Sequence, residues 1–233
     1  MVTVCHVVHP AHCRSRPVRG RGLCLYLEVG TVICVGSREQ LVDAMSDLLW
    51  ERGYAATSPR AVRERCGVGQ GSMYYHFPSK RDLGVAAVEH NCSTLLPGSV
   101  DILEGLGSPL ERLIGYLTRD DHEPLKGCKV GRLTQDPEVV SDPALLAPVK
   151  NSFATIHTML AGVIAEAMEA GELPDSLDAD HLADLMTTSI QGGYVLAIAA
   201  QDRAPFDSAR AGAVDLLRAV SMTPSPQTSR KDS

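Results

Sequence analysis

The strongest constraint in this sequence is residues 57–83, which read TSPRAVRERCGVGQGSMYYHFPSKRDL. Two short segments with helical patterns are separated by Gly67-Val68-Gly69. Gly67 supplies the backbone freedom of a sharp turn, and the apolar Val68 is suited to burial between two crossing helices. The pattern predicts a helix-turn-helix whose second helix enters the major groove of DNA.

Local start and stop signals define the helices of this stretch. Ser58 is expected to cap the first helix, with Pro59 at its first position. The second helix is expected over residues 70–76 and is stopped by Pro78. Ser79 is then expected to cap a further helix, with an acid three residues later. The turn and both of its helices are therefore encoded locally.

The second helix carries two kinds of side chain. Met73 and Phe77 lie four residues apart and should pack into the domain. The start of the helix is small and polar, which suits close approach to base edges and phosphates. Aromatic and imidazole groups near its end can donate hydrogen bonds to phosphate oxygens. The candidate DNA contacts on this helix are Gln70, Gly71, Ser72, Tyr74, Tyr75 and His76.

Charge is distributed unevenly along the chain. The formal net charge of −6 argues against a protein that coats nucleic acid non-specifically. Residues 57–81 nevertheless hold Arg60, Arg63, Arg65, Lys80 and Arg81 against Glu64 alone, whereas acids outnumber bases in residues 91–233. A basic element on an acidic body fits site-specific DNA binding, although a solvated helix face is the alternative. An apolar fraction of 44% with 4% aromatics favours helix-on-helix packing, so the predicted fold class is all-α.

One more helix is expected before the turn, and several after it. Residues 37–40 (SREQ) form a capping box with Ser37 as N-cap, and Gly53 ends that helix. This completes a three-helix domain over residues 37–90. The sequence Leu96-Pro97-Gly98 predicts a break. A helical domain over residues 91–220 then follows, with helices expected from a capping box at residues 108–111, over residues 142–170, 179–201 and 206–220, and a short helix within residues 126–135.

The two ends of the chain differ from its body. Residues 1–36 are interpreted as a disordered or non-native extension, with translation beginning near Val35. An export signal is the alternative, because an apolar run follows four arginines. A metal cluster is conceivable from residue types alone, but we expect none; its members would be Cys5, His6, His9, His12 and Cys13. The seven cysteines include no CxxC pair, which argues against a disulfide framework, and residues 221–233 predict a disordered tail.

Taken together, these motifs resemble the TetR/AcrR-type family of transcriptional regulators. Members of that family show T-S-x-R-x-I, then A-G-V, a small polar stretch, Y-x-H-F, and a serine or threonine before lysine. The corresponding segments here are TSPRAV at residues 57–62, CGV at 66–68, QGSM at 70–73, YYHF at 74–77 and SK at 79–80. The resemblance covers residues 37–90.

The resemblance implies an N-terminal helix-turn-helix DNA-binding domain and a C-terminal helical domain for ligand binding and dimerisation. In that domain the last two helices pair with those of a second subunit. Bases would be contacted by Gln70 and Gly71, and phosphates by Tyr74, Tyr75, His76, Lys80 and Thr57, with Arg60 of the same motif among the DNA contacts. Three positions depart from the family pattern: Arg63 at the helix crossing, Gly69 in place of a common serine, and Gln70 in place of a frequent lysine. Arg63 would reach either solvent or a phosphate, and Gln70 pairs well with adenine.

Within the second domain, residues 127–131 (GCKVG) resemble a stretch that lines the ligand cavity in a subset of TetR-type proteins. Gly192 and Gly193 lie inside a predicted helix, where each costs about 1 kcal/mol relative to alanine, and this indicates close packing against a partner helix or a ligand. The candidate ligand-binding residues are Cys128, Asn151, Phe153, His157, Gln191 and Tyr194.

The sequence thus predicts a cytoplasmic, homodimeric repressor. It would bind double-stranded DNA at a pseudo-palindromic operator and be released by a small, largely apolar effector. The alternative is a thiol-based redox or electrophile sensor that acts through Cys128 or Cys92. We expect no catalytic residues, no metal, no cofactor and no membrane association, because no motif for any of these is found.

Overall fold

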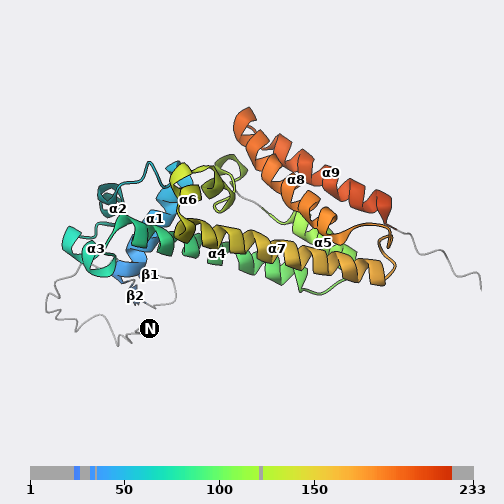
Figure 1. Cartoon of the computed structure of the whole chain (residues 1–233), viewed down its shortest axis with the longest axis horizontal. Coiled ribbons are helices and arrows are strands. Elements are labelled where there is room, and N and C mark those ends of the chain that lie inside the picture. Colours follow the sequence, from blue (N-terminus) through green and yellow to red (C-terminus); the bar gives the residue numbers. More distant parts are fainter. Residues whose placement is uncertain (1–23, 27–31, 35, 121–122, 222–233) are drawn as a thin grey trace, which may run out of the picture. The chain divides into compact units, whose positions relative to one another are not determined.

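The computed structural model describes residues 24–26, 32–34, 36–120 and 123–221. It divides into two compact units, Met1–His90 and Asn91–Ser233, whose helices are labelled in Figure 1. Among the described residues, no helix is both long and apolar enough to cross a membrane. The all-α prediction is confirmed for the described residues from Gly36 onward.

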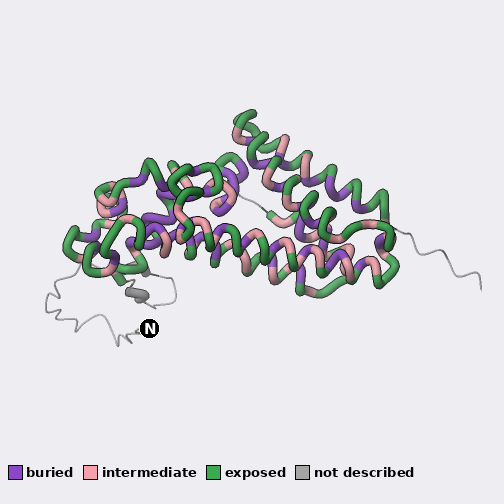
Figure 2. Tube along the Cα trace, in the orientation of Figure 1, coloured by how far each residue is buried: buried purple, intermediate pink, exposed green. Residues whose placement is uncertain are grey.

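The first unit is a three-helix domain followed by the start of a long helix. Its elements are α1 (Ser37–Arg52), α2 (Pro59–Cys66), α3 (Gln70–His76) and the beginning of α4 (Lys80–Leu103). Helix α1 packs against both α2 and α3. Its apolar residues Leu41, Met45 and Leu48 are fully buried, together with Val62 of α2 and Met73 of α3. The buried stripe along α1 is visible in Figure 2.

A short antiparallel ribbon precedes α1. It pairs β1 (Cys24–Tyr26) with β2 (Val32–Cys34), and Leu25 lies opposite Ile33. Both strands fall within the segment that the sequence predicted to be a disordered or non-native extension. The remainder of that segment, including the candidate metal ligands, lies outside the described residues, as does most of the C-terminal tail.

The start of α1 differs from the prediction. Gly36, not Ser37, is the N-cap, and no side chain caps the helix. The Glu39 carboxylate folds back toward Gly36, while both polar atoms of the Gln40 amide are buried without a hydrogen-bond partner in the described part of the chain. Glycine and serine are both acceptable N-caps, so the sequence motif was compatible with a helix start at either of two adjacent residues.

The break predicted at residues 96–98 is wrong. Helix α4 continues through Pro97 to Leu103. A proline inside a helix removes one N–H donor and crowds the preceding turn. Cys92, Ser99 and Leu103 are buried on either side of it, and this burial outweighs the loss of one hydrogen bond.

The second unit is a helical bundle in which local caps define most helix ends. Ser108 and Glu111 form the predicted capping box, with each side chain bonded to the other's backbone N–H. Asp142 and Asp178 cap two long helices, and Gly171, just after the C-cap of the first of these, has φ +71°. The elements are α5 (Pro109–Thr118), α6 (Pro137–Ser141), α7 (Pro143–Glu169), α8 (Ala179–Ala200), α9 (Ala204–Val220) and two 3-10 turns, η1 (Pro124–Lys126) and η2 (Gly131–Gln135).

Packing in this unit follows the order of the long helices. Helix α7 packs on α5 and α8, and α9 packs on α8 and α5, an arrangement that can be followed in Figure 1. The turns η1 and η2 replace the single short helix expected within residues 126–135. Helix α9 begins at Ala204, slightly before its predicted start.

Candidate nucleic-acid interface

The α2–turn–α3 segment has the predicted local geometry. The Ser58 Oγ accepts a hydrogen bond from the Ala61 N–H at 3.2 Å, with Pro59 at the first helical position. Gly67 ends α2 in the left-handed region with φ +71°, and the following Val68 is buried. A residue with a Cβ would be strained at Gly67. The turn thereby sets the direction of α3.

Helix α3 buries one side and exposes the other. Met73 is buried, as is Phe77 one turn later. The opposite stripe consists of Gln70, Gly71, Tyr74 and Tyr75, all exposed, with 84% of Tyr75 accessible. The half-buried His76 meets the Tyr75 ring edge-on, with centroids 5.1 Å apart. Half-buried Ser72 lies at the edge of the stripe. The structure therefore brings the predicted α3 contacts together on one surface.

Thr57 differs from its predicted role. Its side chain is buried, and its hydroxyl donates a hydrogen bond to the Gly53 carbonyl at 2.7 Å. That carbonyl lies just after the end of α1, so Thr57 holds the connection between α1 and α2. We therefore leave Thr57 out of the proposed interface.

The arginines of α2 are partly engaged with carboxylates. Arg60 donates from Nε to Glu64 at 2.7 Å, which raises the pKa of Arg60 and lowers the pKa of Glu64. Both side chains are exposed. Arg65 makes a bidentate pair with Glu51 at 2.7 and 2.6 Å, which joins α2 to α1. Arg63 is half-buried. Arg60 is thus an exposed cation that a phosphate would have to share with Glu64.

The Lys80 side chain is positioned by a contact with a residue outside its own helix. Its Nζ lies 4.0 Å from the centroid of the Tyr54 ring, and Tyr54 is buried after α1. A cation over an aromatic face is attracted by the ring quadrupole. Ser79 accepts the Asp82 N–H at 3.2 Å, which caps α4 as predicted. The lysine is therefore held at the first turn of α4, shortly after the end of α3.

In the second unit, two of the predicted ligand-binding residues lie beside Gly131. The Cys128 thiol is buried and accepts a hydrogen bond from the Gly131 N–H at 3.3 Å. A methyl group on Gly131 would collide with the Gln191 amide oxygen of α8. A methyl group on Gly127, which has φ +76°, would crowd Ile198, two turns further along the same face of α8. The bend at residues 127–131 is thus seated directly on α8.

The other four ligand candidates differ in burial and in their contacts. Tyr194 is buried and stacks on Phe206 of α9, with ring centroids 4.5 Å apart. His157 on α7 is half-exposed, and its Nε2 lies 3.5 Å from an Asp184 carboxylate oxygen. Phe153 is half-buried and Asn151 is exposed. Their role in ligand binding stays a prediction.

An apolar groove of about 570 Å³ lies between α8 and α9. Its walls include Leu182, Leu185, Met186, Ala213, Leu216 and Val220. Leu216 is 58% exposed, and Leu185 and Val220 are exposed as well. Gly192 and Gly212 lie on these helices, and a methyl group on either would meet no atom within 4 Å. Gly193, in contrast, packs closely on Phe206.

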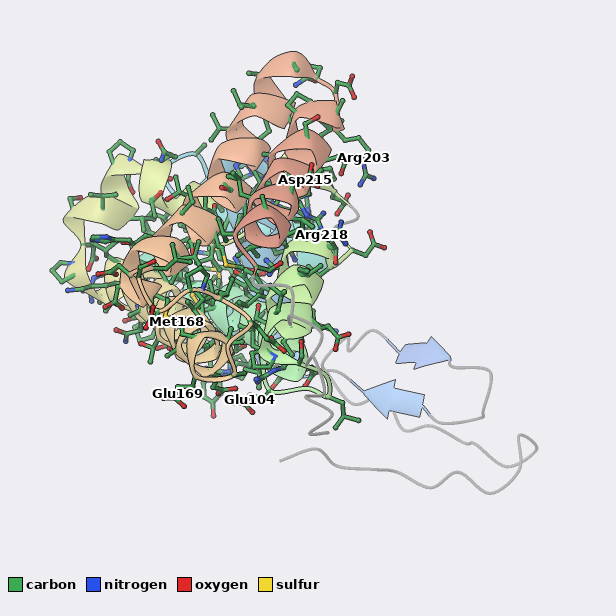
Figure 3. All side chains as sticks on the ribbon, turned by 90° about the vertical axis from the view of Figure 1, so that its right-hand side faces the viewer. Glu104, Met168, Glu169, Arg203, Asp215 and Arg218 are labelled. Carbon is green, nitrogen blue, oxygen red and sulfur yellow. The ribbon has the colours of Figure 1, made fainter. Side chains whose placement is uncertain are left out.

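Arg210 is a buried cation at the junction of α5 and α9. Its guanidinium donates to the carbonyls of Leu117 and Arg119 and lies 4.9 Å from the Phe206 ring centroid. Those carbonyls belong to the end of α5, where the helix dipole is negative. Two nearby arginines, Arg203 at the N-cap of α9 and Arg218 within the helix, are exposed and are labelled in Figure 3. Arg210 alone of the three is buried.

Two family models match the chain. The model described as bacterial regulatory proteins, tetR family, matches residues 37–87. The model described as tetracyclin repressor-like, C-terminal domain, matches residues 103–213. Together they span more than half of the sequence. The chain belongs to the TetR family.

Relatives of the TetR family match over most of the chain. The HTH-type transcriptional regulator YxaF of Bacillus subtilis is 27% identical over 177 residues, covering 72% of this chain and 88% of the relative. The HTH-type transcriptional repressor DhaR of a Mycobacterium species is 27% identical over 176 residues, covering 73% and 86%. A TetR-family regulator from Cytophaga hutchinsonii has the same fold, with a TM-score of 0.71 at 20% identity, covering 80% of this chain and 96% of that one.

TetR-family membership makes this protein a DNA-binding transcriptional regulator of the helix-turn-helix type. Two features of the second unit were not predicted from the sequence. The groove between α8 and α9 had a signal, because Gly192 lies in a small, apolar part of α8. Arg210 had none, because nothing in the sequence around it distinguishes a buried arginine from an exposed one.

Proposed function

We propose that this regulator is a homodimeric repressor that acts in the cytoplasm. It binds a pseudo-palindromic operator and is released by a small, largely apolar effector. The observation that carries the proposal is the exposed apolar face of α8 and α9, with its groove of about 570 Å³. Exposed apolar surface of this kind is uncommon on monomeric proteins and is typical of subunit interfaces. The relative DhaR is a transcriptional repressor, which supports repression over activation.

The recognition helix supplies the reason for a dimer. Helix α3 has seven residues, so one copy offers few side chains to specify a DNA site. A two-fold dimer doubles these contacts and requires two half-sites about 34–36 Å apart, or a multiple of that spacing. The glycines on α8 and α9 support the pairing, because Gly192 and Gly212 leave open space that the backbone of a partner helix could approach closely.

The bend at residues 127–131 is the part of the second unit best suited to an effector. It places the Cys128 thiol and the Gln191 amide of α8 on either side of the Gly131 backbone. A coupling of about 1–3 kcal/mol between this site and DNA would be enough for regulation. In this proposal the remaining ligand candidates, including Tyr194 and His157, do not contact the effector and have structural or surface roles.

No specific observation favours the thiol-sensor alternative. Cys128 and Cys92 are both buried, which hinders attack by an oxidant or electrophile. Lys126, which flanks Cys128 in the sequence, forms an ion pair with Glu123 at 2.5 Å. If Cys128→Ser abolished release from DNA by oxidants while keeping DNA binding, the sensor hypothesis would replace the repressor one.

Selection of bound DNA from a random pool tests the proposal most directly. The full-length protein should recover a two-fold symmetric motif, and the complex should contain two protein chains per site. The selected motif also yields the half-site spacing. Recovery of DNA without two-fold symmetry, or of one chain per site, would contradict the homodimeric proposal.

A further inference from the structure

Helix α2 carries two arginine–carboxylate pairs that use the guanidinium group differently. Arg65 donates from both Nη1 and Nη2 to Glu51, at 2.7 and 2.6 Å. Arg60 donates from Nε alone to Glu64, at 2.7 Å. The Nη1–Nη2 edge of Arg65 is therefore occupied within the fold. The same edge of Arg60 makes no hydrogen bond to the described part of the chain.

The open edge of Arg60 lies on the solvent-facing side of α2. Arg60 and Glu64 are one helical turn apart, and their side chains are 80% and 62% exposed. Val62, on the opposite side of the helix, is buried. In a helix-turn-helix the first helix crosses the DNA backbone while the second enters the major groove. The free edge of Arg60 is thus available to DNA.

A carboxylate bound at Nε prepares an exposed arginine for one kind of contact. It restricts the conformations of a long side chain, and ordering such a side chain is a cost of binding. It also leaves the two Nη groups as a planar pair of donors, which matches two neighbouring acceptors. DNA displays acceptor pairs at O6 and N7 of guanine and at the phosphate oxygens.

We propose that Glu64 is a positioning residue that holds Arg60 in the orientation in which its Nη1–Nη2 edge contacts two acceptors of the operator. The proposal rests on the DNA-binding function and on Arg60 as one of the DNA contacts. Orientation strengthens binding in the register that the operator fixes, whereas the charge of Glu64 lowers the affinity for DNA of any sequence. Glu64 therefore raises the ratio of the affinity for the operator to the affinity for unrelated DNA.

Two substitutions in the full-length protein separate the orientation of Arg60 from the charge of Glu64. Fluorescence anisotropy measures binding to a duplex that the wild-type protein selects from a random pool, and to an unrelated duplex of equal length. Glu64→Ala should lower the ratio of the two affinities by about fivefold, because Arg60 must then be ordered on binding. Glu64→Gln keeps an acceptor oxygen for the Arg60 Nε but removes the charge. It should raise both affinities together and keep their ratio within about twofold of the wild type.

A double-mutant cycle shows whether Glu64 acts through Arg60. In an Arg60→Ala background, Glu64→Ala should leave the ratio of affinities unchanged, because the side chain that Glu64 positions is absent. The start of α9 offers a matched control, an exposed pair four residues apart in which Arg203 donates from Nε to Asp207 at 2.8 Å. Asp207→Ala removes that carboxylate outside the DNA-binding unit and should leave both affinities unchanged.

Arg60→Ala identifies which acceptors the arginine contacts. If they are O6 and N7 of guanine, a repeated selection should lose a G·C preference at one position of each half-site. If they are phosphate oxygens, the motif should be unchanged, and the slope of log Kd against log salt should flatten by about one for each lost contact. Both results support the proposal and distinguish its two sources of acceptors.

Four outcomes would overturn the inference. An unchanged motif and salt slope in Arg60→Ala would remove Arg60 from the DNA contacts. An unchanged or raised ratio in Glu64→Ala would leave the ion pair with no role beyond α2 itself. Equal losses of the ratio in Glu64→Ala and Glu64→Gln would assign the effect to charge. A loss that persisted in the Arg60→Ala background would show that Glu64 does not act through Arg60. In each case a two-fold symmetric wild-type motif bound by two chains would still support the proposed function, so the two failures are distinguishable.

Discussion

The exposed face of α3 and the exposed face of α8 and α9 are built from different side chains. The first presents Gln70, Tyr74 and Tyr75, which carry hydrogen-bonding groups. The second presents Leu216 and other aliphatic residues around an apolar groove. Donors at defined positions suit DNA, which displays acceptors on bases and phosphates. Apolar area without donors suits a second protein surface, because its burial removes the area from water.

The largest expected effect comes from placing a charge on the apolar face. Leu216→Asp should abolish dimerisation at micromolar concentration, because two-fold symmetry buries two unpaired carboxylates in one interface. Binding to the selected operator should fall with it by about a hundredfold or more. Sedimentation equilibrium measures the first effect and fluorescence anisotropy the second.

A matched control distinguishes a charge placed in the interface from a charge placed at any exposed leucine. Leu106 is fully exposed on the turn between α4 and α5, away from the groove. Leu106→Asp should leave both dimerisation and DNA binding unchanged. If Leu216→Asp remained dimeric, the exposed face of α8 and α9 would not be the dimer interface.

The next effect concerns the bundle that supports the apolar face. Arg210→Ala leaves two carbonyls at the end of α5 without their donor and should lower the free energy of unfolding by about 3 kcal/mol. Arg218→Ala, an exposed position on the same helix, should change it by less than about 0.5 kcal/mol. Urea unfolding of both variants gives the comparison. Equal effects would contradict a structural role for the buried arginine.

A smaller effect is expected at the DNA-binding face. Lys80→Ala should weaken binding similarly for selected and unrelated duplexes, because a phosphate contact carries no sequence information. The slope of log Kd against log salt should flatten by about one for each lost phosphate contact. Gln70→Ala, in contrast, should keep the slope and relax the base preference. Identical behaviour of the two variants would contradict the assignment of Lys80 to phosphate contacts and of Gln70 to base contacts.

The smallest effect is a pH dependence at the start of α8. The Asp178 carboxylate accepts the His181 N–H, and this hydrogen bond lowers the pKa of Asp178. A carboxyl group with a lowered pKa stabilises the folded state above its ordinary pKa and loses that contribution as the pH falls through its folded value. Asp178→Asn keeps the cap but removes the charge. Its unfolding free energy should therefore fall less than that of the wild type below about pH 4. Parallel curves for the two proteins would exclude the contribution.

The sequence predicted more of the α3 face than of the apolar face of α8 and α9. The bounds of α3 at residues 70–76, the cap at Ser58 and the turn at Gly67 follow from signals within a few residues. The same kind of signal predicted the capping box at Ser108. It misplaced the N-cap of α1, because two adjacent residues were both suitable caps. It also predicted a break at Pro97, where burial along α4 overrides the proline.

Such local signals could not predict contacts between segments that are distant in the sequence. Thr57 shares a motif with the predicted DNA contacts, but its hydroxyl is bonded to the carbonyl of Gly53. The sequence predicted six individual ligand candidates, and only the folded chain shows that Cys128 and Gln191 both lie beside Gly131. Which side of a helix faces a cavity depends on how its neighbours pack, and sequence periodicity gives only the apolar side.

By itself, the sequence determined the fold class, the helix-turn-helix and the residues exposed on α3. Caps, turns and helical periodicity act over three to four residues, so they can be recognised without knowing the rest of the fold. Tertiary structure alone decided that Thr57 and Arg210 are buried and that α8 and α9 leave an apolar groove. Those outcomes depend on which helices meet, and that choice is made by burial summed over many residues distant in sequence.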